Sequence, residues 1–328
     1  MGVKLEDVAR RAGLSKATVS LALNGNPRIS AKTRARLEVL AREMGYRPNP
    51  YARNLATRRS RQIGLIVPDI ENVYYASLAQ NIFNALRASD YGLSISVSMN
   101  SPELERKIIA GMIENRMDAL MLAPVNRPNE NPDYLSQLDE AGMPMLFVTA
   151  DYPSIARPRV MCDLYGGMRL VMLALCARGY RRIAMLSGPE NVYCLDLRTQ
   201  GYADFIQTVG LAYHRCYHLD GVRYEDAQAF VRTHPDLDAD ALVCVNDMMA
   251  LGAINALRER GVRVPEDMAV TGYDDVIFAT VSPVPITTVR QDVGEISREA
   301  VSRILAMAQG HAADSCLLPC ELVCRDSI

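Results

Sequence analysis

The spacing of apolar residues along the chain changes near residue 62. Before that point, apolar residues recur at the period of an amphipathic helix within residues 5–12, 16–24 and 30–44. Beyond it, short apolar runs typical of buried strands alternate with stretches of helical spacing. The pattern predicts an all-α head followed by an α/β body.

The head has the pattern of a helix-turn-helix. Gly13 supplies the backbone freedom that a tight turn needs, and Ser15 is a good N-cap for the helix that follows. A third helix begins at Ser30 and ends at Gly45. In a helix-turn-helix the second helix lies in the major groove of DNA, so the head is a candidate DNA reader.

The body shows two similar series of strands and helices. The first has the strand-type runs IGLIVPD, LSISVS, DALMLAP and PMLFVT, with helical spacing at 74–89, 102–116 and 132–142. The second has the runs RRIAMLSGP, ALVCVN and DMAVTGYDD, with helical spacing near 166–178, 195–209, 224–234 and 247–260. Such alternation predicts two open lobes of parallel sheet. Because ligands bind at the carboxyl ends of these strands, two facing lobes should form a cleft.

Charge is divided unevenly along the 328 residues. Residues 1–61 hold 14 lysines and arginines against four acidic residues, a net charge of +10. The remaining residues hold 22 basic and 34 acidic side chains, a net charge of -12. A compact basic head on an acidic body indicates that the head binds a polyanion, for which nucleic acid is the leading candidate.

The composition, 49% hydrophobic and 23% charged, is that of a folded chain of two or three domains. No apolar run approaches the roughly 18 residues of a membrane span, and the N-terminus lacks the apolar core of a signal peptide. None of the eight cysteines forms a Cys-x-x-Cys pair, and several lie in apolar runs. These features predict a cytoplasmic protein without a disulfide framework.

Two segments of the head, VARRAGLSKATVSLALNG and GYRPNPYARNLATRRS, resemble the DNA-binding head of the lactose/galactose repressor (LacI/GalR) family of bacterial transcription regulators. Further segments resemble family motifs in the same order: IGLIVPD, ARGYRRIAMLSGP, RTQGYADF, VCVNDMMALGAINALRERGVRVPEDMAVTGYDD, ITTVRQD and LVCRDS. The resemblance covers essentially the whole chain. It implies an all-α helix-turn-helix head and an α/β periplasmic-binding-protein-like body of two parallel-sheet lobes.

The resemblance also implies domain boundaries. A helix-turn-helix domain is expected at 1–47, a hinge helix or linker at 48–61, and an effector-binding and dimerisation body at 62–328. Lobe 1 of the body is expected at about 62–160 plus 291–317, and lobe 2 at about 161–290 plus 318–328.

DNA contacts in the head follow from the resemblance position by position. Lys16, Ala17 and Leu21 fall where the family reads base edges, and Thr18 and Ser20 fall where it touches phosphates. Ala17 makes no hydrogen bond with a base, so the operator sequence does not follow. The alternative for Thr18 and Ser20 is ordinary solvated helix surface. The full set expected to contact DNA in the head is Ser15, Lys16, Ala17, Thr18, Ser20, Leu21 and Asn24.

The segment 49–60 is predicted to form a hinge helix. It permits only about two turns, and isolated helices below about 12 residues are marginal in water. In the family this helix pairs with its dimer mate in the minor groove, where a leucine matching Leu55 is inserted between base pairs. The alternative is a flexible tether with Leu55 packed on the body. Ala56 stands where some relatives have lysine. The contacts expected here are Asn49, Tyr51, Leu55 and Ala56.

Polar residues gather at the predicted strand ends of both lobes. By resemblance, Arg198 matches the arginine that contacts effector in the family. Carboxylates and amides in such an arrangement can bind hydroxyls bidentately, as a sugar requires. Each of these residues could instead cap a helix or bond between the lobes. The full set expected to bind effector is Asp69, Tyr74, Tyr75, Thr149, Arg198, Asn246, Asp274 and Gln291.

The effector class is narrowed by two features. The chain has no tryptophan, which leaves Tyr74, Tyr75 or Tyr193 to stack on a sugar ring. Val192 stands where purine-binding relatives have an arginine. These features favour a sugar or sugar derivative as effector. A nucleoside-responsive regulator and one controlled by a protein partner remain as alternatives.

Motifs of enzymes and metal sites are missing from the sequence. It has no Gly-x-Ser-x-Gly elbow, no phosphate loop, no Gly-x-Gly-x-x-Gly after a strand and no His-Glu-x-x-His. The DLDAD segment at 236–240 begins like a calcium loop, but Ala241 replaces the required glycine. Cys316, Cys320 and Cys324 could share one strand face. We predict that the chain is not an enzyme and uses no metal or cofactor.

Two chains are required by a head that reads a two-fold operator. After its last predicted strand the chain has no leucine heptad of the kind that tetrameric relatives use, so a homodimer is expected. By resemblance the dimer surface lies on the helix at 75–87, with Leu78, Ile82 and Phe83 exposed, and on the helix near 102–116. Core packing is the alternative for these apolar residues. The sequence thus predicts a dimeric, operator-binding repressor whose affinity for DNA is set by a small molecule.

Overall fold

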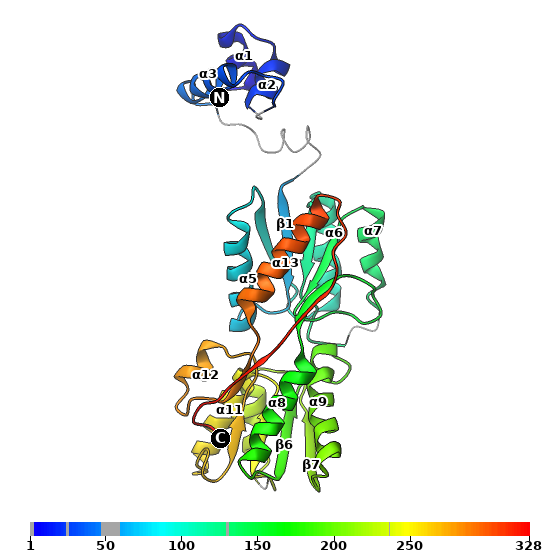
Figure 1. The fold of residues 1–328 in the computed structure, drawn as a ribbon, viewed down its shortest axis with the longest axis vertical. Helices are drawn as coiled ribbons and strands as arrows, with labels where there is room; N and C mark the ends of the chain where they lie inside the picture. The colour runs from blue at the N-terminus through cyan, green and yellow to red at the C-terminus, as the bar shows by residue number, and fades with distance from the viewer. Residues whose placement is uncertain (1–2, 24–25, 47–59, 129–130, 236) are drawn as a thin grey trace. The chain divides into compact units, whose positions relative to one another are not determined.

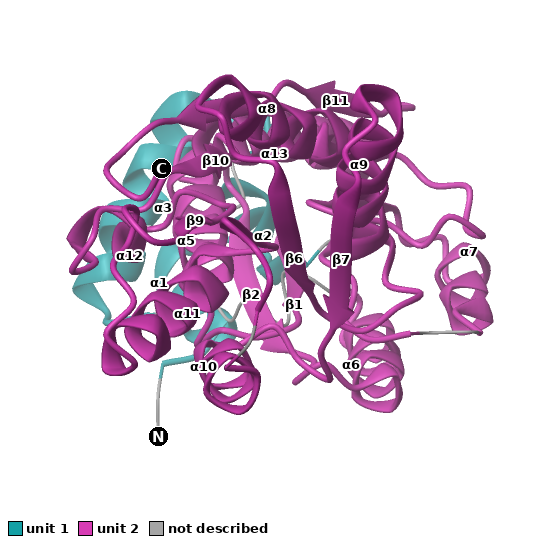
Figure 2. Cartoon of the chain, turned by 90° about the horizontal axis from the view of Figure 1, so that it is seen from below, with its two compact units in different colours: residues 1–60 teal, residues 61–328 magenta. Residues whose placement is uncertain are grey.

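A computed structural model describes residues 3–23, 26–46, 60–128, 131–235 and 237–328. The chain separates into two compact units, residues 1–60 and 61–328, which Figure 2 draws in different colours. The head has its own small hydrophobic core, and the body has two larger ones.

The head contains three helices in the order predicted from the apolar spacing. They are α1 (Leu5–Ala12), α2 (Lys16–Leu23) and α3 (Ala31–Glu43). Gly13 ends α1 with φ of 70°, a conformation that glycine adopts without steric cost. Val8, Val19 and Leu37, one from each helix, are at most 1% exposed and meet in the core. The helix-turn-helix arrangement of the sequence prediction is confirmed.

Lobe 1 of the body is a six-stranded parallel sheet with the strand order β11-β5-β4-β3-β1-β2. One face is covered by α5 and α13, and the other by α6, η1 and α7 (Figure 1). The strands are β1 (Gln62–Val67), β2 (Gly92–Val97), β3 (Ala119–Leu122), β4 (Met145–Val148), β5 (Arg159–Cys162) and β11 (Cys316–Leu318). The helices are α5 (Val73–Leu86), α6 (Pro102–Glu114), the 3-10 helix η1 (Asp133–Ser136), α7 (Gln137–Glu140) and α13 (Val293–Ala308).

Lobe 2 is a four-stranded parallel sheet with the strand order β7-β6-β8-β9. Helices α8 and α9 pack together on one face, and α10 and α11 on the other. The strands are β6 (Arg182–Ser187), β7 (Tyr213–His218), β8 (Ala241–Cys244) and β9 (Ala269–Thr271). The helices are α8 (Leu164–Ala177), α9 (Tyr193–Val209), α10 (Tyr224–Thr233), α11 (Asp247–Glu259) and α12 (Ile277–Val281).

Three segments of the chain cross between the lobes. One joins β5 to α8, and the second joins β10 (Thr288–Arg290) to α13. The third joins β11 to β12 (Glu321–Val323) and is visible as the long red segment in Figure 1. In lobe 2, β10 and β12 pair antiparallel. Each lobe therefore contains residues from distant parts of the sequence, and the crossings form the hinge of the body.

The predicted fold class, a helical head and a body of two parallel-sheet lobes, is confirmed. The apolar pattern did not single out β5, β7 or α13, nor the short strands β10, β11 and β12. Strand β7 lies at a sheet edge and has the polar sequence YHRCYH, which masks its strand character. The stretch predicted as one helix at 132–142 is instead η1 followed by the single turn α7.

Candidate functional sites

The first candidate site is the outer face of α2 in the head. Lys16, Ala17 and Leu21 are exposed on this face, with Leu21 at 40%. The Nζ atom of Lys16 lies 2.6 Å from Oε1 of Glu6 on α1. This hydrogen bond and the charge of Lys16 lower the pKa of Glu6. Because more than half of each side chain is exposed, Lys16 can exchange Glu6 for another partner, such as an anionic phosphate or a hydrogen-bond acceptor on a base edge.

Ser15 and Thr18 are hydrogen-bonded to each other at the start of α2. The Oγ atom of Ser15 accepts a hydrogen bond from the Thr18 backbone N–H at 3.1 Å, and the two hydroxyl oxygens are 2.8 Å apart. Ser15 is thus the N-cap that the sequence predicted. Thr18 and Ser20 are partly buried. The other predicted DNA contacts, Asn24, Asn49, Tyr51, Leu55 and Ala56, lie outside the described residues.

The second candidate site is a chain of hydrogen bonds buried between the lobes. Arg198 on α9 donates to the carbonyl oxygen of Val245 and, at 3.1 Å, to Oδ1 of Asp274. Gln291 Nε2 donates to the same Asp274 oxygen at 2.7 Å. The hydroxyl of Tyr74, on α5 of lobe 1, donates to Gln291 Oε1 at 3.2 Å. This series of hydrogen bonds therefore connects a helix of lobe 1 to a helix of lobe 2.

Burial has the largest effect on the pKa of Asp274, the carboxylate in this series of hydrogen bonds. Asp274 is 8% exposed, and its burial raises the pKa of the carboxyl, while Arg198 and Gln291 act in the opposite direction. The guanidinium of Arg198 also lies over the Tyr273 ring, 4.1 Å from the centroid. Its Nε atom has no hydrogen-bond partner in the described part of the chain. This leaves one buried donor that a ligand oxygen could satisfy.

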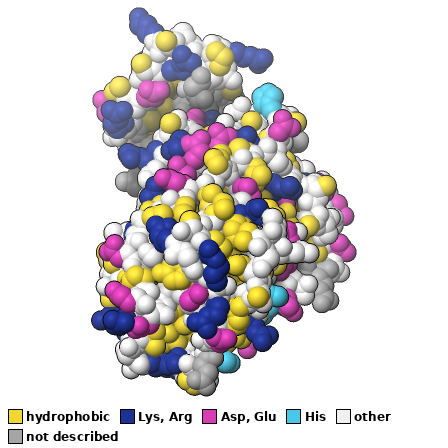
Figure 3. Space-filling model, turned by 60° about the horizontal axis from the view of Figure 1, so that its bottom comes forward, with side chains coloured by type: hydrophobic (Ala, Val, Ile, Leu, Met, Phe, Trp, Pro, Cys, Tyr) yellow, Lys and Arg dark blue, Asp and Glu magenta, His cyan; other side chains and the backbone are white. Residues whose placement is uncertain are grey.

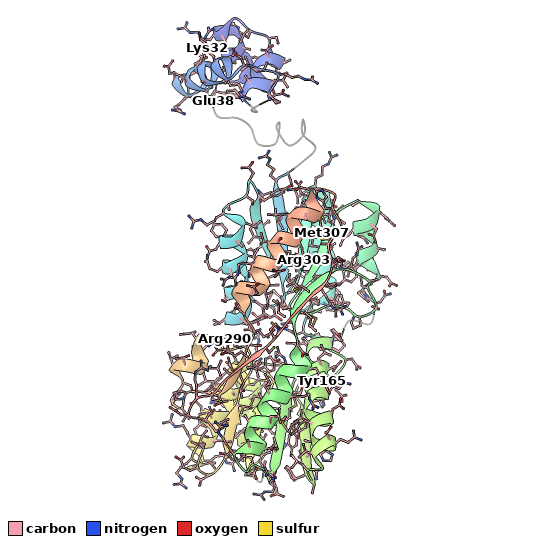
Figure 4. All side chains as sticks on the ribbon, in the orientation of Figure 1. Lys32, Glu38, Tyr165, Arg290, Arg303 and Met307 are labelled. Atoms are coloured by element: carbon pink, nitrogen blue, oxygen red, sulfur yellow. The ribbon has the colours of Figure 1, made fainter. Side chains whose placement is uncertain are left out.

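The backbone at Asp274 and Asp275 turns the two carboxylates toward different partners. Both residues have positive φ, 105° and 53°, and the Asp274 N–H donates to Val289 O at 2.8 Å. Asp275 accepts from Nε of Arg290 at 2.7 Å and from Arg325 at 2.5 Å. Figure 4 shows Arg290 at the level where the lobes meet. Asp274 thus belongs to the interlobe chain, and Asp275 braces the hinge strand beside it.

Asn246 and Tyr75 have partners in the protein as well. Asn246 caps α11 by accepting from the Met249 N–H at 2.8 Å, and its Nδ2 donates to Val222 O at 2.8 Å. Tyr75 Oη accepts from Asn126 Nδ2 at 3.1 Å. Thr149 is buried and has φ of 67°. All three residues line the same central cavity as Arg198, Asp274, Gln291 and Tyr74.

Three adjoining cavities lie between the lobes. The central cavity has a volume of about 30 Å³, room for little more than one water molecule. An outer cavity of about 600 Å³ shares Asn72, Asn126 and Val222 with it. A third cavity, of about 270 Å³, shares Ala150 and Cys194 with the central one. A ligand of sugar size therefore fits the outer space, and reaches the central chain only if the side chains or lobes move.

Asp69 is placed differently from the other predicted effector contacts. It lines the outer cavity and not the central one. Its Oδ2 atom lies 3.3 Å from Arg223 in lobe 2, and its Oδ1 atom accepts from the Glu71 N–H at 2.9 Å. Asp69 and Arg223 thus form an ion pair across the mouth of the cleft.

Asn126 and Cys194 were missed by the sequence analysis. Asn126 lines the central and outer cavities, and Cys194 Sγ lies 3.5 Å from its Oδ1 atom. Asn126 follows the strand run DALMLAP by two residues, so the strand-end argument applied to Asp69 would also have found it. Cys194 begins no motif, and its sequence offers no such signal.

For Leu78 and Ile82 the alternative of core packing is correct, and the shared strand face suggested for three cysteines is not found. Leu78 and Ile82 are 0% exposed, because α5 turns this stripe toward the sheet and α13, whereas Phe83 is 51% exposed. Cys316 and Cys320 do not share a strand face with Cys324. Cys316 lies on β11, Cys320 between the two strands and Cys324 after β12.

No group of three or more histidine, cysteine or acidic side chains in the described ranges could hold a metal ion. Among the described helices, none combines the length and the hydropathy that crossing a bilayer requires.

Comparison with known proteins finds a family match for the head and a domain match for the body. The family model of bacterial regulatory proteins, lacI family, matches residues 4–49, and the periplasmic binding protein-like domain matches residues 173–328. The HTH-type transcriptional repressor CytR of Escherichia coli (strain K12) is 30% identical, over 98% of this chain and 95% of CytR.

Solved structures with the same fold include the Lac repressor dimer bound to operator and the anti-inducer ONPF. It has a TM-score of 0.87 and 26% identity, covering 100% of this chain and 99% of that one. A CelR–cellobiose complex has a TM-score of 0.73 and 28% identity, covering 99% and 100%. The chain belongs to the LacI family of DNA-binding transcriptional regulators.

Proposed function

We propose that the chain represses transcription as a homodimer on a palindromic operator, and that a sugar or sugar derivative in the interlobe cleft sets its affinity for DNA. The observation that carries the proposal is the buried chain from Tyr74 through Gln291 and Asp274 to Arg198. A hydroxylated ligand that forms hydrogen bonds with these groups changes the hydrogen bonds that join the two lobes. The complex of the relative CelR with cellobiose supports a carbohydrate.

Binding must exchange existing bonds for new ones. The central cavity is nearly filled, and its carboxylate and amide groups already bond to one another. A ligand in the outer cavity gains those groups only by displacing their present partners. Effector and DNA are then coupled through two lobe arrangements. Moving such a balance from 1:99 to 99:1 takes roughly 5.5 kcal/mol of differential binding.

On the DNA side, α2 supplies the sequence-reading groups. Lys16 donates to base acceptors, Leu21 contacts a thymine methyl, and Thr18 and Ser20 bind phosphates, while Ser15 positions the helix as its cap. By resemblance to the family, Asn49, Tyr51, Leu55 and Ala56 also contact DNA, and Leu55 inserts into the minor groove. Since its target is DNA, the protein acts in the cytoplasm.

The alternatives fit the described residues less well. A regulator controlled only by a protein partner has no use for an outer cavity of about 600 Å³ with acidic, amide and arginine side chains. For a nucleoside, the site lacks the arginine of purine-binding relatives. Val192 stands at that position, is 4% exposed and lines the third cavity. We also infer that the cleft binds its ligand without transforming it. In the central cavity the buried carboxylate of Asp274 is held by Arg198 and Gln291, and in the third cavity the buried carboxylate of Asp151 is paired with Arg159 at 2.8 Å.

A ligand screen tests the effector class. Sugars, sugar phosphates, polyols and nucleosides are added to the full-length protein, and its unfolding temperature is measured. A ligand at 100 times its dissociation constant adds about 2.7 kcal/mol of stability. A rise with sugars alone supports the proposal. A rise with nucleosides alone supports the nucleoside alternative.

A variant then links the ligand to the chain of hydrogen bonds. An operator is selected in vitro, and its release by the ligand is followed by fluorescence anisotropy. Arg198→Ala should retain operator binding and lose the response to ligand. Arg232→Ala is the control, because Arg232 forms an exposed ion pair with Glu259 outside the cavities described above. Release of DNA by Arg198→Ala at the wild-type ligand concentration would show that the site is assigned wrongly.

The dimer is tested by light scattering. Exposed apolar side chains for such an interface are present on α5 and α12, where Phe83, Ile277 and Val281 are each more than half exposed. Figure 3 shows apolar side chains spread between charged ones on one face. The expected mass without DNA is about twice the 36.3 kDa of one chain. A monomer at micromolar concentration would refute the dimer.

A further inference from the structure

Two cysteines meet where the chain crosses between the lobes. Cys162 is the last residue of β5, and Cys320 lies between β11 and β12. The two crossings run side by side, because Cys162 pairs with Leu318 in the sheet register. The N–H of the next residue, Asp163, donates to Leu318 O at 2.8 Å.

The two cysteines lie on neighbouring segments in the hinge. Cys162 pairs in register with Leu318, two residues before Cys320, and each thiol shifts the pKa of the other. The hydroxyl of Tyr273 lies 3.5 Å from Cys320 Sγ and donates to Leu164 O at 3.1 Å, so it joins the same two crossings. Cys162 is 0% exposed, whereas Cys320 is only partly buried. Cys320 is thus the more exposed residue of the pair.

The surroundings give the two sulfurs different roles. The hydrogen bond from Cys162 lowers the pKa of Cys320, burial opposes this, and Tyr273 and the positive charge of Arg198 lower the pKa further. Donating that hydrogen bond, together with burial, raises the pKa of Cys162. The more acidic and more accessible thiol is the one that attacks an oxidant, and its buried neighbour can resolve the product.

We propose that Cys162 and Cys320 are a reversible oxidation site, and that their disulfide locks the hinge of the body. The Cys320 thiolate attacks one oxygen of hydrogen peroxide, the O–O bond breaks, and Cys320 becomes a sulfenic acid with release of hydroxide, which takes up a proton as water. The Cys162 sulfur then attacks the Cys320 sulfur and expels the hydroxyl as a second water. Two thiols and one peroxide give one disulfide and two waters, and each sulfur loses one electron.

The bond would act on the effector site through the hinge. It would join two of the three interlobe crossings covalently, so the lobes could no longer move freely against each other. Tyr273 contacts Cys320 with its hydroxyl and Arg198 with its ring. The oxidised protein should therefore hold one lobe arrangement and resist the change that ligand binding requires.

Peptide mapping tests the bond directly. Full-length protein is treated with hydrogen peroxide, digested without reductant and analysed by mass spectrometry. A peptide with Cys162 linked to one with Cys320, two hydrogens lighter than the sum of the two thiol peptides and released by dithiothreitol, is expected. Links to other cysteines only, or sulfinic acid at Cys320 without a link, would overturn the proposal.

Two variants separate the pair from general cysteine oxidation. Cys320→Ser should lose the linked peptide, whereas Cys316→Ser, which removes a partly buried thiol from the neighbouring strand, should keep it. Oxidation should raise the unfolding temperature of wild type and Cys316→Ser by on the order of 5 °C, reversibly with dithiothreitol. An equal rise in Cys320→Ser would show that another bond is responsible.

Discussion

Helix α2 of the head and the interlobe cleft both present polar side chains that can bind a ligand. These side chains are exposed on α2 but buried in the cleft. Lys16 on α2 lies at the surface in an exposed pair with Glu6. Arg198 lies buried, with Asp274, Tyr273 and Val245 around it. A surface group can exchange partners at little cost, whereas a buried group that loses its partner pays the full cost of desolvation. The difference teaches that DNA can be read by a preformed surface, while an effector must rearrange the interior.

The largest effect is expected when one partner of the buried Arg198–Asp274 ion pair is removed. Asp274→Ala should lower the free energy of unfolding by about 3–5 kcal/mol, because it leaves the Arg198 guanidinium buried without its carboxylate. Denaturant titration of the body measures the loss. Asp238→Ala is the matched control, since Asp238 forms an exposed pair with Arg182 and should change the value by less than about 0.5 kcal/mol. Equal losses in both variants would remove the distinction between buried and exposed pairs.

Glu105 extends the comparison to pH. This side chain on α6 is 0% exposed, accepts from the hydroxyls of Tyr134 and Tyr152, and has one oxygen, Oε2, with no partner among the described residues. Burial raises its pKa from 4.5 to about 7, although both tyrosines act against the shift. The contribution of Glu105 to stability is therefore fully present below about pH 4.5 and is lost as the pH rises toward 7.

Glu105→Gln should remove this dependence. Relative to wild type, the stability of the variant should rise between pH 4.5 and 7 and level off above pH 7, with a total change of about 3 kcal/mol. Denaturant titrations at several pH values measure the difference. Glu103→Gln, an exposed change on the same helix, should follow the wild-type profile. A difference that is constant from pH 4 to 8 would mean that Glu105 does not titrate in this range.

In the head, the comparison predicts a change in affinity without a change in stability. Lys16→Ala should weaken binding to the selected operator by about 1–3 kcal/mol, because it removes a base contact, and should leave the unfolding temperature unchanged. Lys32→Ala removes the same charge from α3, where Figure 4 labels the residue, and should weaken binding less. Equal effects on operator and random DNA would indicate a phosphate contact at Lys16 in place of base reading.

The smallest effect is expected at the mouth of the cleft. Asp69 and Arg223 join the lobes, but the arginine side chain is 62% exposed, so their bond contributes less than about 1 kcal/mol. Asp69→Asn should change the affinity of the ligand found by screening only a few-fold, as measured by calorimetry. The change should shrink at high salt, which screens an exposed pair. A change that persists at high salt would instead indicate that Asp69 contacts the ligand.

The helices of the head and the position of polar residues at strand ends could be predicted from the sequence because both depend on local patterns. Three consecutive amphipathic stretches suffice for the head, and a polar residue after an apolar run suffices for Asp274. The direction of a side chain on a helix that packs on both a sheet and a second helix is not local. Leu78 was placed outside for this reason, because α13, which helps to bury it, comes more than 200 residues later in the chain.

The hydrogen-bond and ion-pair partners of the polar side chains could not be predicted from the sequence either. Nothing in the order of residues shows that Asp69 pairs with Arg223, or that Cys162 meets Cys320, since these contacts join segments separated by about 150 residues. The size of the central cavity likewise depends on side chains from both lobes. Such features require the three-dimensional arrangement, and they decide how a ligand enters.

The two adjacent aspartates after β9 have a consequence for protein engineering. Under the proposed function Asp274 binds the ligand, whereas Asp275 is bound by Arg290 and Arg325 outside the chain of hydrogen bonds between the lobes. A library that varies Asp274 and Gln291 while it keeps Asp275 would therefore alter ligand preference on an unchanged scaffold. A library that also varies Asp275 would mix folding failures with changes of preference, and few of its members could be interpreted.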